Sequence, residues 1–511
     1  MADAAYVGVD LGTQGVRALA VDGAGRVLAT ASRPLHGRRD GTHHEQDPAD
    51  WWAGTAGALS DVTAALPPGT AVAAVAVCAT SGTVLLTGPD GVPRTRALMY
   101  DDARAGDLAA EAQEAGAAVW TRLGYRMQPA WALPKLLWWR DRGLLVDGAR
   151  LAHQPDVVTA ALVGHPVAAD SSHALKTGYD LLADAWPVEV LERLRIDPAV
   201  LPPVQRAGTV LGTVGPAAAA RTGLPVGIPV VAGMTDGCAA QLGAGALAPG
   251  EWNSVLGTTL ALKGVTRSPL QDPTGAVYSH RAPVLDGDHV DLWLPGGASS
   301  TGAGAVSALF PDADLDALTA AAARVRDVPL CYPLTGAGER FPFVAPDARG
   351  FLGEGGGPLV PDGDITNGDP AVLFAAVCTG VAHVERLCFD LLDDAGADVT
   401  GPISLTGGGA RNDWWNQLRC DLLGVPVRLP DATGASGTAL GMAVLAAGAV
   451  DGDGARAAAA RMVRVRDVLH PDPDRGAELT PGYHAFVAAL ADRGWLDAGV
   501  ARHARTRVPA A

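Results

Sequence analysis

Residues 6–15 read Y-V-G-V-D-L-G-T-Q-G and carry the strongest fold signal in the sequence. The apolar residues predict a buried strand that ends at Asp10, and Gly12 begins a turn. Residues 16–21 predict a second strand and residues 27–30 a third, so the glycine turn joins strands of an antiparallel meander. A Rossmann nucleotide motif needs a helix directly after its glycines. The pattern therefore argues against a nicotinamide-dependent oxidoreductase.

A second strand-turn-strand unit follows roughly half a chain later. Residues 251–256 predict a strand, G-T-T at 257–259 a turn, and residues 260–265 another strand. The L-G-T of the first turn recurs here in the same setting, which indicates two related lobes. The copies differ at one position, because Asp10 of the first corresponds to Val255 of the second. Only the first unit therefore brings a carboxylate.

Both turns are candidates for holding phosphate groups. Glycine lets backbone amides approach an anion without a Cβ in the way, and threonine adds a hydroxyl donor. Such amides allow even an acidic protein to bind a nucleotide such as ATP. Each turn alone is equally well explained as an ordinary tight turn, but the pair favours phosphate binding. The candidate residues are Gly12, Thr13, Gln14, Gly257, Thr258 and Thr259.

A third glycine run, residues 407–410, lies between a predicted strand at 403–406 and a predicted helix at 412–423. Glycines pack against a flat base, and polar or aromatic residues of the next helix complete such a pocket. A strand-to-helix turn with tryptophans in the core explains the same residues. The candidates for adenine binding are Gly408, Gly409, Asn412 and Trp415.

Two aspartates are the candidates for catalysis. Asp10 suits Mg²⁺, because a hard cation prefers carboxylate oxygens. Asp236 follows a predicted strand at 229–232 and precedes a predicted helix from 238, so it can project into a cleft and accept the proton of an attacking hydroxyl. Asp236 also fits an ordinary helix cap, and Asp10 fits a residue that only caps a turn.

Composition limits the function classes. The 511 residues suffice for two large domains, and 48% hydrophobic with 18% charged residues is a globular balance. A net charge of -16 without clustered Lys and Arg argues against a nucleic-acid partner. Six scattered cysteines without a C-x-x-C pair, no signal peptide and no uninterrupted apolar span predict a cytoplasmic protein that does not enter a membrane. The adjacent His43 and His44 point apart, so they do not predict a metal site, and His173, His280 and His383 are expected to be structural.

Other segments give coarser predictions. Asp47-Pro48 predicts a helix start, residues 71–77 a buried strand, and residues 84–86 another strand. Helices are expected from about 104 to 200 and over 435–450. The stretch 353–370 is expected to be a surface loop, and the tail from 455 to be helical, fraying at its basic end, 502–507.

Taken together, the motifs resemble the FGGY carbohydrate kinases of the actin-like ATPase superfamily along nearly the whole chain. The resemblance is carried by D-L-G-T-Q-G from Asp10, E-Q-D-P-A-D-W-W from Glu45, Y-D-D-A-R from Tyr100, T-D-G from Thr235, L-G-T-T from Leu256 and T-G-G-G-A-R-N from Thr406. It implies an α/β fold with two actin-like (ribonuclease H-like) ATPase domains and an interdomain cleft. It also implies a sugar-binding domain over 1–245, a nucleotide-binding domain over 246–511, and ATP and Mg²⁺ as cofactors.

Within the family, several stretches resemble the D-ribulose kinase branch. They are A-T-S-G-T-V-L-L from Ala79, A-L-K-T-G-Y-D from Ala174, V-Y-S-H-R from Val277, G-G-A-S-S-T-G from Gly296 and G-E-R-F-P-F from Gly338. Xylulokinases typically carry Met-His near the position of Thr80 and Ser81. The resemblance implies that Asp10, Ser81, Asp102 and Asp236 contact the sugar.

The expected reaction is phosphorylation of D-ribulose to D-ribulose 5-phosphate. D-xylulose or another polyol is the alternative within the family, and an actin-like scaffold ATPase is the alternative from another class. The expected partners are a small sugar and ATP. A homodimer is compatible with the sequence, which does not fix the oligomeric state.

Overall fold

The first sheet is built around the predicted meander. The computed structural model describes residues 4–146, 148–272, 274–286, 291–353, 357–359, 369–431 and 435–507. β1 (Ala4–Leu11), β2 (Gly15–Asp22) and β3 (Val27–Pro34) are antiparallel, while β6 (Ala71–Ala79) and β13 (Pro229–Val231) extend the sheet in parallel to β1. With the edge strand β12 (Val210–Thr213) the order is β12-β13-β6-β1-β2-β3. The three predicted strands of the meander, the strand at 71–77 and the strand at 229–232 are confirmed.

Helices cover both faces of this sheet. α1 (Pro48–Ala64), which Asp47 caps as predicted, packs with α5 (Gln154–Val163) against one face. On the other face lie α9 (Asp236–Gly243) and α14 (Ala435–Asp451). The strands alternate side chains between two covered faces, so β1 is apolar almost throughout.

The second sheet repeats the arrangement of the first. β14 (Trp252–Leu256) and β15 (Leu260–Gly264) form an antiparallel pair, as predicted, and β21 (Ile403–Thr406) lies parallel to β14. The order is β16-β17-β15-β14-β21-β22-β23, so β22-β21-β14-β15 occupies the places of β13-β6-β1-β2. The sequence repeat therefore extends beyond the two hairpins to the parallel strands beside them.

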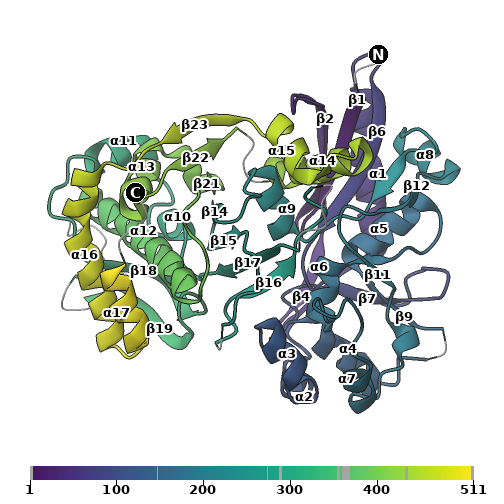
Figure 1. Ribbon diagram of the computed structural model, residues 1–511, viewed down its shortest axis with the longest axis horizontal. Coiled ribbons are helices and arrows are strands. Elements are labelled where there is room, and N and C mark those ends of the chain that lie inside the picture. Colours follow the sequence, from purple (N-terminus) through teal and green to yellow (C-terminus); the bar gives the residue numbers. More distant parts are fainter. Residues whose placement is uncertain are drawn as a thin grey trace.

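The two halves meet along α9 and α14, which Figure 1 shows between the two sheets. A Cβ on Gly243 would lie 1.8 Å from the carbonyl oxygen of Gly437, and one on Gly441 would lie 1.9 Å from that of Ala239. Glycine is therefore required for the helices to approach this closely. Because α14 packs on β1 and β6, one apolar cluster contains residues of both halves, while the boundary at 245/246 stays a prediction.

Residues from about 84 to 205 form an additional layer at one end of the first sheet, around its own apolar cluster. The strand predicted at 84–86 is confirmed as β7, but the stretch predicted to be helical, 104–200, also contains strands. One of these, β9, pairs with β7 in a five-stranded sheet that also contains β4, β5 and β8. The elements of this layer are β4 (Gly37–Asp40), β5 (His43–Gln46), β7 (Val84–Thr87), β8 (Ala97–Leu98), β9 (Arg150–His153), β10 (Ala169–Asp170), β11 (Val204–Gln205), α2 (Ala109–Ala115), α3 (Ala117–Leu123), α4 (Ala132–Asp141), α6 (Ser171–Ala174) and α7 (Val188–Arg193).

The core of the second half is centred on α12 (Pro370–Asp394). Among the described helices, α12 alone is long and apolar enough to cross a membrane, but 89% of its most apolar window is buried inside the protein, as in a core helix. The remaining elements are β16 (Tyr278–Arg281), β17 (Trp293–Ala298), β18 (Cys331–Glu339), β19 (Ala345–Leu352), β20 (Gly357–Pro358), β22 (Val427–Pro430), β23 (Val465–Leu469), α8 (Pro216–Thr222), α10 (Gly304–Leu309), α11 (Leu315–Ala322), α13 (Asp413–Leu423), α15 (Gly454–Met462), α16 (Pro473–Asp492) and α17 (Ala498–Thr506).

The tail differs from its prediction in two ways. It contains the edge strand β23, and its basic end does not fray. Arg507 lies 2.6 Å from Asp390, and His503 lies 2.8 Å from Asp393, both on the acidic C-terminal end of α12. The basic residues therefore neutralise carboxylates of the same chain, and the helix holds to Thr506. Most of the loop predicted at 353–370 lies outside the described residues.

Candidate active site

The two predicted catalytic carboxylates lie at the same edge of the first sheet. Asp10 is at the carboxyl end of β1, opposite Cys78 of the parallel strand β6. Thr235 pairs with Ala79 at the end of β6, and Asp236 follows as the first residue of α9. Carboxyl ends of parallel strands meet at one edge of a sheet, and loops there form binding sites. The fold therefore brings Asp10 and Asp236 together from positions more than 200 residues apart in the sequence.

The two carboxylates influence one another electrostatically. Burial, and then the negative charge of Asp236, raise the pKa of Asp10 to about 7, while Arg17, 3.7 Å away, works in the opposite direction. Burial also raises the pKa of Asp236, although a hydrogen bond from the Gly237 N–H at 2.7 Å opposes this. The site thus contains one buried and one partly buried acidic group, both with raised pKa values.

Three cationic side chains that the sequence analysis did not select surround Asp236. The charges of Lys176, His173 and Lys263 all favour its ionised form. Lys263 reaches it from β15 of the second half and lies 3.1 Å from Nδ1 of His280. Burial, followed by the charge of Lys263, lowers the pKa of His280 well below its usual value, so His280 is neutral and its Nδ1 accepts from the ammonium.

A buried network holds the backbone that leads into Asp236. The Thr235 N–H donates to Ser172 Oγ at 2.9 Å, and Ser172 Oγ donates to Asp170 at 2.5 Å. His173 Nδ1 lies 2.5 Å from Asp170, whose charge raises the pKa of His173 against the effect of burial. His173 was expected to be merely structural, but it also lies close enough to influence Asp236. The D-S-S-H sequence at 170–173, in which Asp170 caps a helix, was the sequence feature that could have indicated this network.

The loop after β6 is held by two lysines. Lys176 Nζ donates to the carbonyl of Ser81 at 3.1 Å, and Lys135 Nζ donates to the carbonyl of Gly82 at 2.9 Å and that of Met99 at 2.6 Å. Lys135 is fully buried, and burial lowers its pKa to about 7. The Ser81 hydroxyl oxygen is buried without a hydrogen-bond partner among the described residues. A buried unpaired hydroxyl beside a catalytic pair is suited to a polar ligand.

Asp102 has several hydrogen-bond partners within the protein, and its contact with the sugar stays a prediction. Its side chain is fully buried and accepts from the His44 N–H at 2.7 Å. It also accepts from the Arg104 N–H at 3.1 Å and from two nitrogens of the Arg104 guanidinium at 2.8 to 3.0 Å. These donors occupy both carboxylate oxygens, so we assign Asp102 to anchoring β5 and the 100–104 segment. The D-x-R spacing was a signal for this pairing.

The first hairpin turn is tight and anchored from the side of β5. The Gly12 N–H donates to the carbonyl of Gly15 at 3.0 Å. Gln46 Nε2 donates to the carbonyl of Thr13 at 2.7 Å, and Gln46 in turn accepts from Trp51 Nε1. Gln14 at the tip is exposed. The turn therefore has a fixed backbone and an open outer face.

The second hairpin borders a large cavity of about 750 Å³. The Gly257 N–H donates to the carbonyl of Thr259 at 3.1 Å, which closes the turn. Leu256, Gly257 and Thr258 line the cavity together with Ala303 and Gly304 of the following loop. Thr259, which was predicted with them, is absent from this lining. A volume of this size accommodates a nucleotide-sized ligand.

The predicted adenine residues line the same cavity. Gly408, Gly409, Asn412 and Trp415 all border it, as do Trp414, Phe374 and Arg411, which were not selected. A Cβ on Gly408 would meet no atom within 4 Å, so this residue leaves free space. Gly407 has φ +88°, and its backbone passes so close to Leu256 that a Cβ would lie 2.5 Å from the Leu256 carbonyl oxygen. The glycine run is thereby joined to the second hairpin.

Asn412 and Trp415 also have structural partners. Asn412 Oδ1 caps α13 by accepting from the Trp415 N–H at 3.0 Å, and its Nδ2 donates to Thr319 at 2.8 Å. The Trp415 indole N–H donates to the carbonyl of Cys378 at 2.9 Å, and the ring is almost fully buried. Trp414 is more accessible and stacks on Phe374 with ring centroids 6.4 Å apart. Trp414 is therefore the better aromatic surface for a base.

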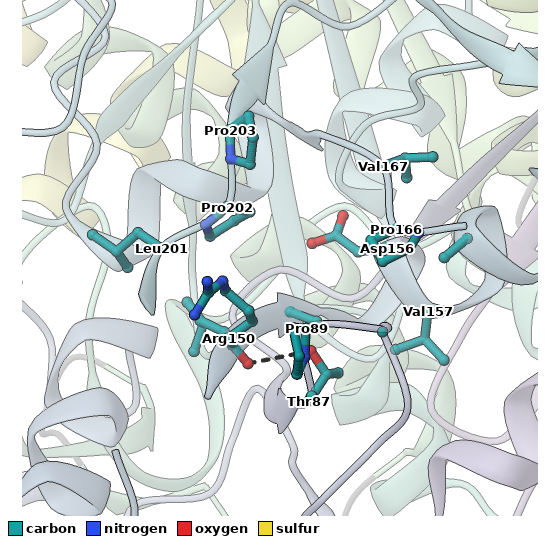
Figure 2. Close-up of a pocket in the computed structure, with 15 residues that line it drawn as sticks. Thr87, Pro89, Arg150, Asp156, Val157, Pro166, Val167, Leu201, Pro202 and Pro203 are labelled. Carbon is teal, nitrogen blue, oxygen red and sulfur yellow. Dashed lines mark hydrogen bonds between the residues drawn. The ribbon is translucent and has the colours of Figure 1, made fainter. Parts of the chain in front are cut away.

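A second kind of cavity lies away from these residues. Figure 2 shows Thr87 and Arg150 on neighbouring strands, with Pro202 and Pro203 on another wall. Its volume is about 160 Å³, and mostly proline and aliphatic side chains line it. None of the predicted site residues contributes to it. This cavity does not belong to the candidate active site.

The comparisons with known proteins agree with the geometry. Residues 5–243 match the N-terminal domain, and residues 253–450 the C-terminal domain, of the FGGY family of carbohydrate kinases. The chain is 34% identical over 469 residues to a xylulose kinase of Streptomyces coelicolor, covering 89% of this chain and 90% of that protein. It is 29% identical over 469 residues to a glycerol kinase of Citrifermentans bemidjiense, covering 86% and 88%. The crystal structure of xylulose kinase from Rhodospirillum rubrum superposes with a TM-score of 0.82 at 26% identity, covering 96% and 99%.

Proposed function

Because this chain belongs to the FGGY family of carbohydrate kinases, we propose that it phosphorylates a ketopentose, with D-ribulose as substrate and D-ribulose 5-phosphate as product. That it is a sugar kinase acting on a small sugar and ATP follows from the family; the identity of the sugar is the proposal. The observation that carries the chemistry is the pair of carboxylates with raised pKa values, Asp10 and Asp236, at the edge from which the Ser81 loop also projects. An actin-like scaffold would have no use for such a pair.

In the proposed mechanism Asp236 is the general base. The sugar hydroxyl gives its proton to the Asp236 carboxylate, its oxygen bonds to the γ-phosphorus, and the bond from phosphorus to the β-γ bridging oxygen breaks to release ADP. Burial raises the pKa of Asp236 and so makes it a stronger base than an exposed aspartate. The positive charges of Lys176 and Lys263 oppose this rise and favour the ionised carboxylate.

The residues present fit a divalent cation near Asp10. The charge of Asp236 disfavours the ionised form of the buried Asp10, and a hard cation relieves that repulsion. Asp10 would hold Mg²⁺, which neutralises phosphate charge when bound. Among the described residues no three His, Cys, Asp or Glu side chains converge, so Asp10 would share the ion with the phosphates and water. The chain's own contribution is to hold Asp10 at a fixed strand end.

The nucleotide is proposed to occupy the cavity of the second half. Its phosphates would face Gly257 and Thr258, with Gly12 and Thr13 across the gap, and its base would lie against Gly408 and Trp414. This division corresponds to a sugar-binding domain over 1–245 and a nucleotide-binding domain over 246–511. We propose a cytoplasmic location for such an enzyme, and a homodimer as its assembly.

The choice of D-ribulose rests on the loop that carries Thr80 and Ser81. Thr80 is tied to Gln154 at 2.6 Å and Thr83 at 2.6 Å, whereas the Ser81 hydroxyl has no partner among the described residues and is proposed to contact the sugar. D-xylulose is the second candidate, because the xylulose kinase of Streptomyces coelicolor is 34% identical to this chain. The two sugars differ in configuration at C3.

The experiment is a substrate panel with the purified enzyme, ATP and Mg²⁺. We expect kcat/KM for D-ribulose to exceed that for D-xylulose, glycerol and other polyols by about tenfold or more, since one lost hydrogen bond to a hydroxyl is worth about that much. The 5-phosphate should be identified by NMR. A kcat/KM for D-xylulose equal to or above that for D-ribulose would contradict the proposed substrate, and glycerol as the best substrate would contradict a ketopentose altogether.

A further inference from the structure

Glu339 forms the centre of a buried hydrogen-bond cluster in the second half. It ends β18, and only 3% of its surface is exposed. One carboxylate oxygen accepts from the Ser300 N–H at 2.6 Å and the Arg340 N–H at 2.9 Å. The other accepts from the hydroxyls of Ser299 at 2.8 Å, Tyr332 at 2.9 Å and Thr301 at 3.2 Å.

These donors replace a counter-ion. Within the described part of the chain no Lys, Arg or His forms an ion pair with Glu339. A buried carboxylate is costly unless several donors stabilise it, and six donors from three segments converge on this one, the sixth being the Phe341 N–H at 3.5 Å. The cluster therefore fixes residues 299–301 relative to β18, and removing the carboxylate leaves fixed backbone N–H groups unpaired.

The segment bound by Glu339, residues 299–301, and the residues that follow it form backbone hydrogen bonds with the second hairpin. The Leu260 N–H donates to the Thr301 carbonyl at 2.8 Å, and the Ser299 N–H donates to the Leu260 carbonyl at 2.9 Å. One step further, the Ala303 N–H donates to the Gly257 carbonyl at 2.9 Å, and the Gly304 N–H to the Thr258 carbonyl at 3.1 Å. Every residue of the turn from 257 to 260 except Thr259 thus has a backbone bond to this segment.

The packing between the two segments leaves no room for adjustment. A Cβ on Gly302 would lie 2.6 Å from backbone atoms of Thr259. Ala303 and Gly304 also line the 750 Å³ cavity beside Gly257 and Thr258. A displacement of residues 299–304 must therefore change both the turn and the wall of the cavity.

We propose that Glu339 is a positioning residue for the nucleotide phosphates, acting through residues 299–304 on the Gly257-Thr258-Thr259 turn. The proposal rests on the assignment of that cavity to the nucleotide, but it does not depend on which sugar accepts the phosphate. It also gives G-G-A-S-S-T-G from Gly296 and G-E-R-F-P-F from Gly338 a shared role. Ser299, Ser300 and Thr301 of the first stretch and Glu339 of the second are parts of one hydrogen-bond cluster beside this cavity.

The test compares Glu339→Ala and Glu339→Gln with Arg340→Ala as matched control, because Arg340 is the exposed neighbour in the same segment. ADP affinity is measured by titration calorimetry, and KM for ATP and for the best sugar by steady-state kinetics. Glu339→Ala should weaken ADP binding and raise KM for ATP by about tenfold or more, and leave KM for the sugar within about twofold. Arg340→Ala should match the wild type in all of these.

Glu339→Gln separates positioning from a loss of folding. Its amide oxygen can accept from the two backbone N–H groups while its NH₂ donates to hydroxyls, which can rotate. We expect an intermediate loss of ADP affinity of about threefold. Folded Glu339→Gln or Glu339→Ala with ADP affinity and KM for ATP unchanged would overturn the proposal, as would an equal rise in KM for the sugar. The measurement of ADP affinity by calorimetry tests this inference even if the wild type phosphorylates no ketopentose. That outcome would contradict the proposed function and not this inference.

Discussion

The two hairpins share one backbone design and differ in charge. Asp10 in β1 lies opposite Arg17 and Cys78, and Val255 at the matching place in β14 lies opposite Ala261 and Thr406. Both turns are closed by a backbone bond from their glycine, at 3.0 Å in the first and 3.1 Å in the second. The parallel strand beside each hairpin leads into a loop, 80–83 in the first half and 407–410 in the second.

The surroundings of the hairpins differ in the same way. Four ionisable groups surround the first hairpin, and each is partly or fully buried: Asp10, Asp236, Lys176 and Lys135. The charge of Asp236 raises the pKa of Asp10, and the charge of Lys176 acts on both Asp236 and Lys135. Around the second, the lining of the cavity consists mainly of glycine, alanine, threonine and aromatic residues, and its charged residues are Asp316, Arg411 and Asp413. We therefore propose that one scaffold used twice separates proton transfer from phosphate binding, and this proposal can be tested by exchanging or removing charges.

The largest effect is expected from removing the base in the first half. Asp236→Asn should lower kcat for the sugar by about 10³-fold, because the amide cannot accept the hydroxyl proton. ADP affinity should stay within about twofold, since the cavity lies in the other half. Steady-state kinetics and calorimetry on the same preparation check both parts. Retention of more than about a tenth of the wild-type kcat would remove Asp236 from the role of base.

Removing the charge of the first hairpin should reduce activity and increase stability. Asp10→Asn should lower kcat/KM by about 10²-fold. Burial raises the pKa of Asp10 from 3.8 to about 7, so its ionised form destabilises the folded protein above that pH, and the penalty declines as pH falls towards 4. We therefore expect Asp10→Asn to raise Tm by about 1–3 °C at pH 8 and by less at pH 5.

The same pKa shift predicts the pH dependence of the wild type. The reaction needs ionised Asp10 and Asp236, so kcat/KM should fall as pH is lowered from about 7, well above the range of an ordinary aspartate. Scanning calorimetry of Asp10→Asn and the pH profile of the wild type both test the raised pKa of Asp10. A lower Tm for Asp10→Asn at pH 8, or a flat profile down to pH 5, would contradict the assigned electrostatics.

A smaller effect is expected from adding the missing charge to the second hairpin. Val255→Asp copies the first hairpin and should raise KM for ATP by about tenfold, because a carboxylate there repels phosphate. Val255→Asn is the matched neutral control and should raise KM for ATP by less than about threefold. Equal KM values for the two variants would show that charge at this position does not distinguish the hairpins.

Local pattern was sufficient to predict the scaffold of both halves. The glycine turns, the alternation to buried strands and the shared L-G-T are short-range features, and the structure confirms both hairpins and the strands and helices that follow. In the region from 84 to 205 the strand at 84–86 was predicted, but the short strands β8 and β9 were not, since they gain stability from pairing across the chain.

The missing parts of the site depend on long-range contacts. Lys176 lies 95 residues from its partner Ser81, and Lys135 lies 53 residues from Gly82, so no local pattern links them. Asp102 shows the opposite limit, because a family segment was found correctly but not the fact that Arg104 and His44 already occupy its oxygens. Likewise, the segments at 296–302 and 338–343 carried only a resemblance to one branch of the family, and their contact through Glu339 could not be predicted from the sequence.

The proposed separation of proton transfer and phosphate binding between the two hairpins can be tested most directly by a crystal structure with D-ribulose, Mg²⁺ and a non-hydrolysable ATP analogue. We predict the sugar between Asp10, Ser81 and Asp236, with its 5-hydroxyl in hydrogen-bond contact with Asp236. The phosphates should lie between the two turns and the adenine against Trp414. A sugar bound away from Asp10 and Asp236, or an analogue bound outside the cavity bordered by Gly257 and Gly408, would contradict the account.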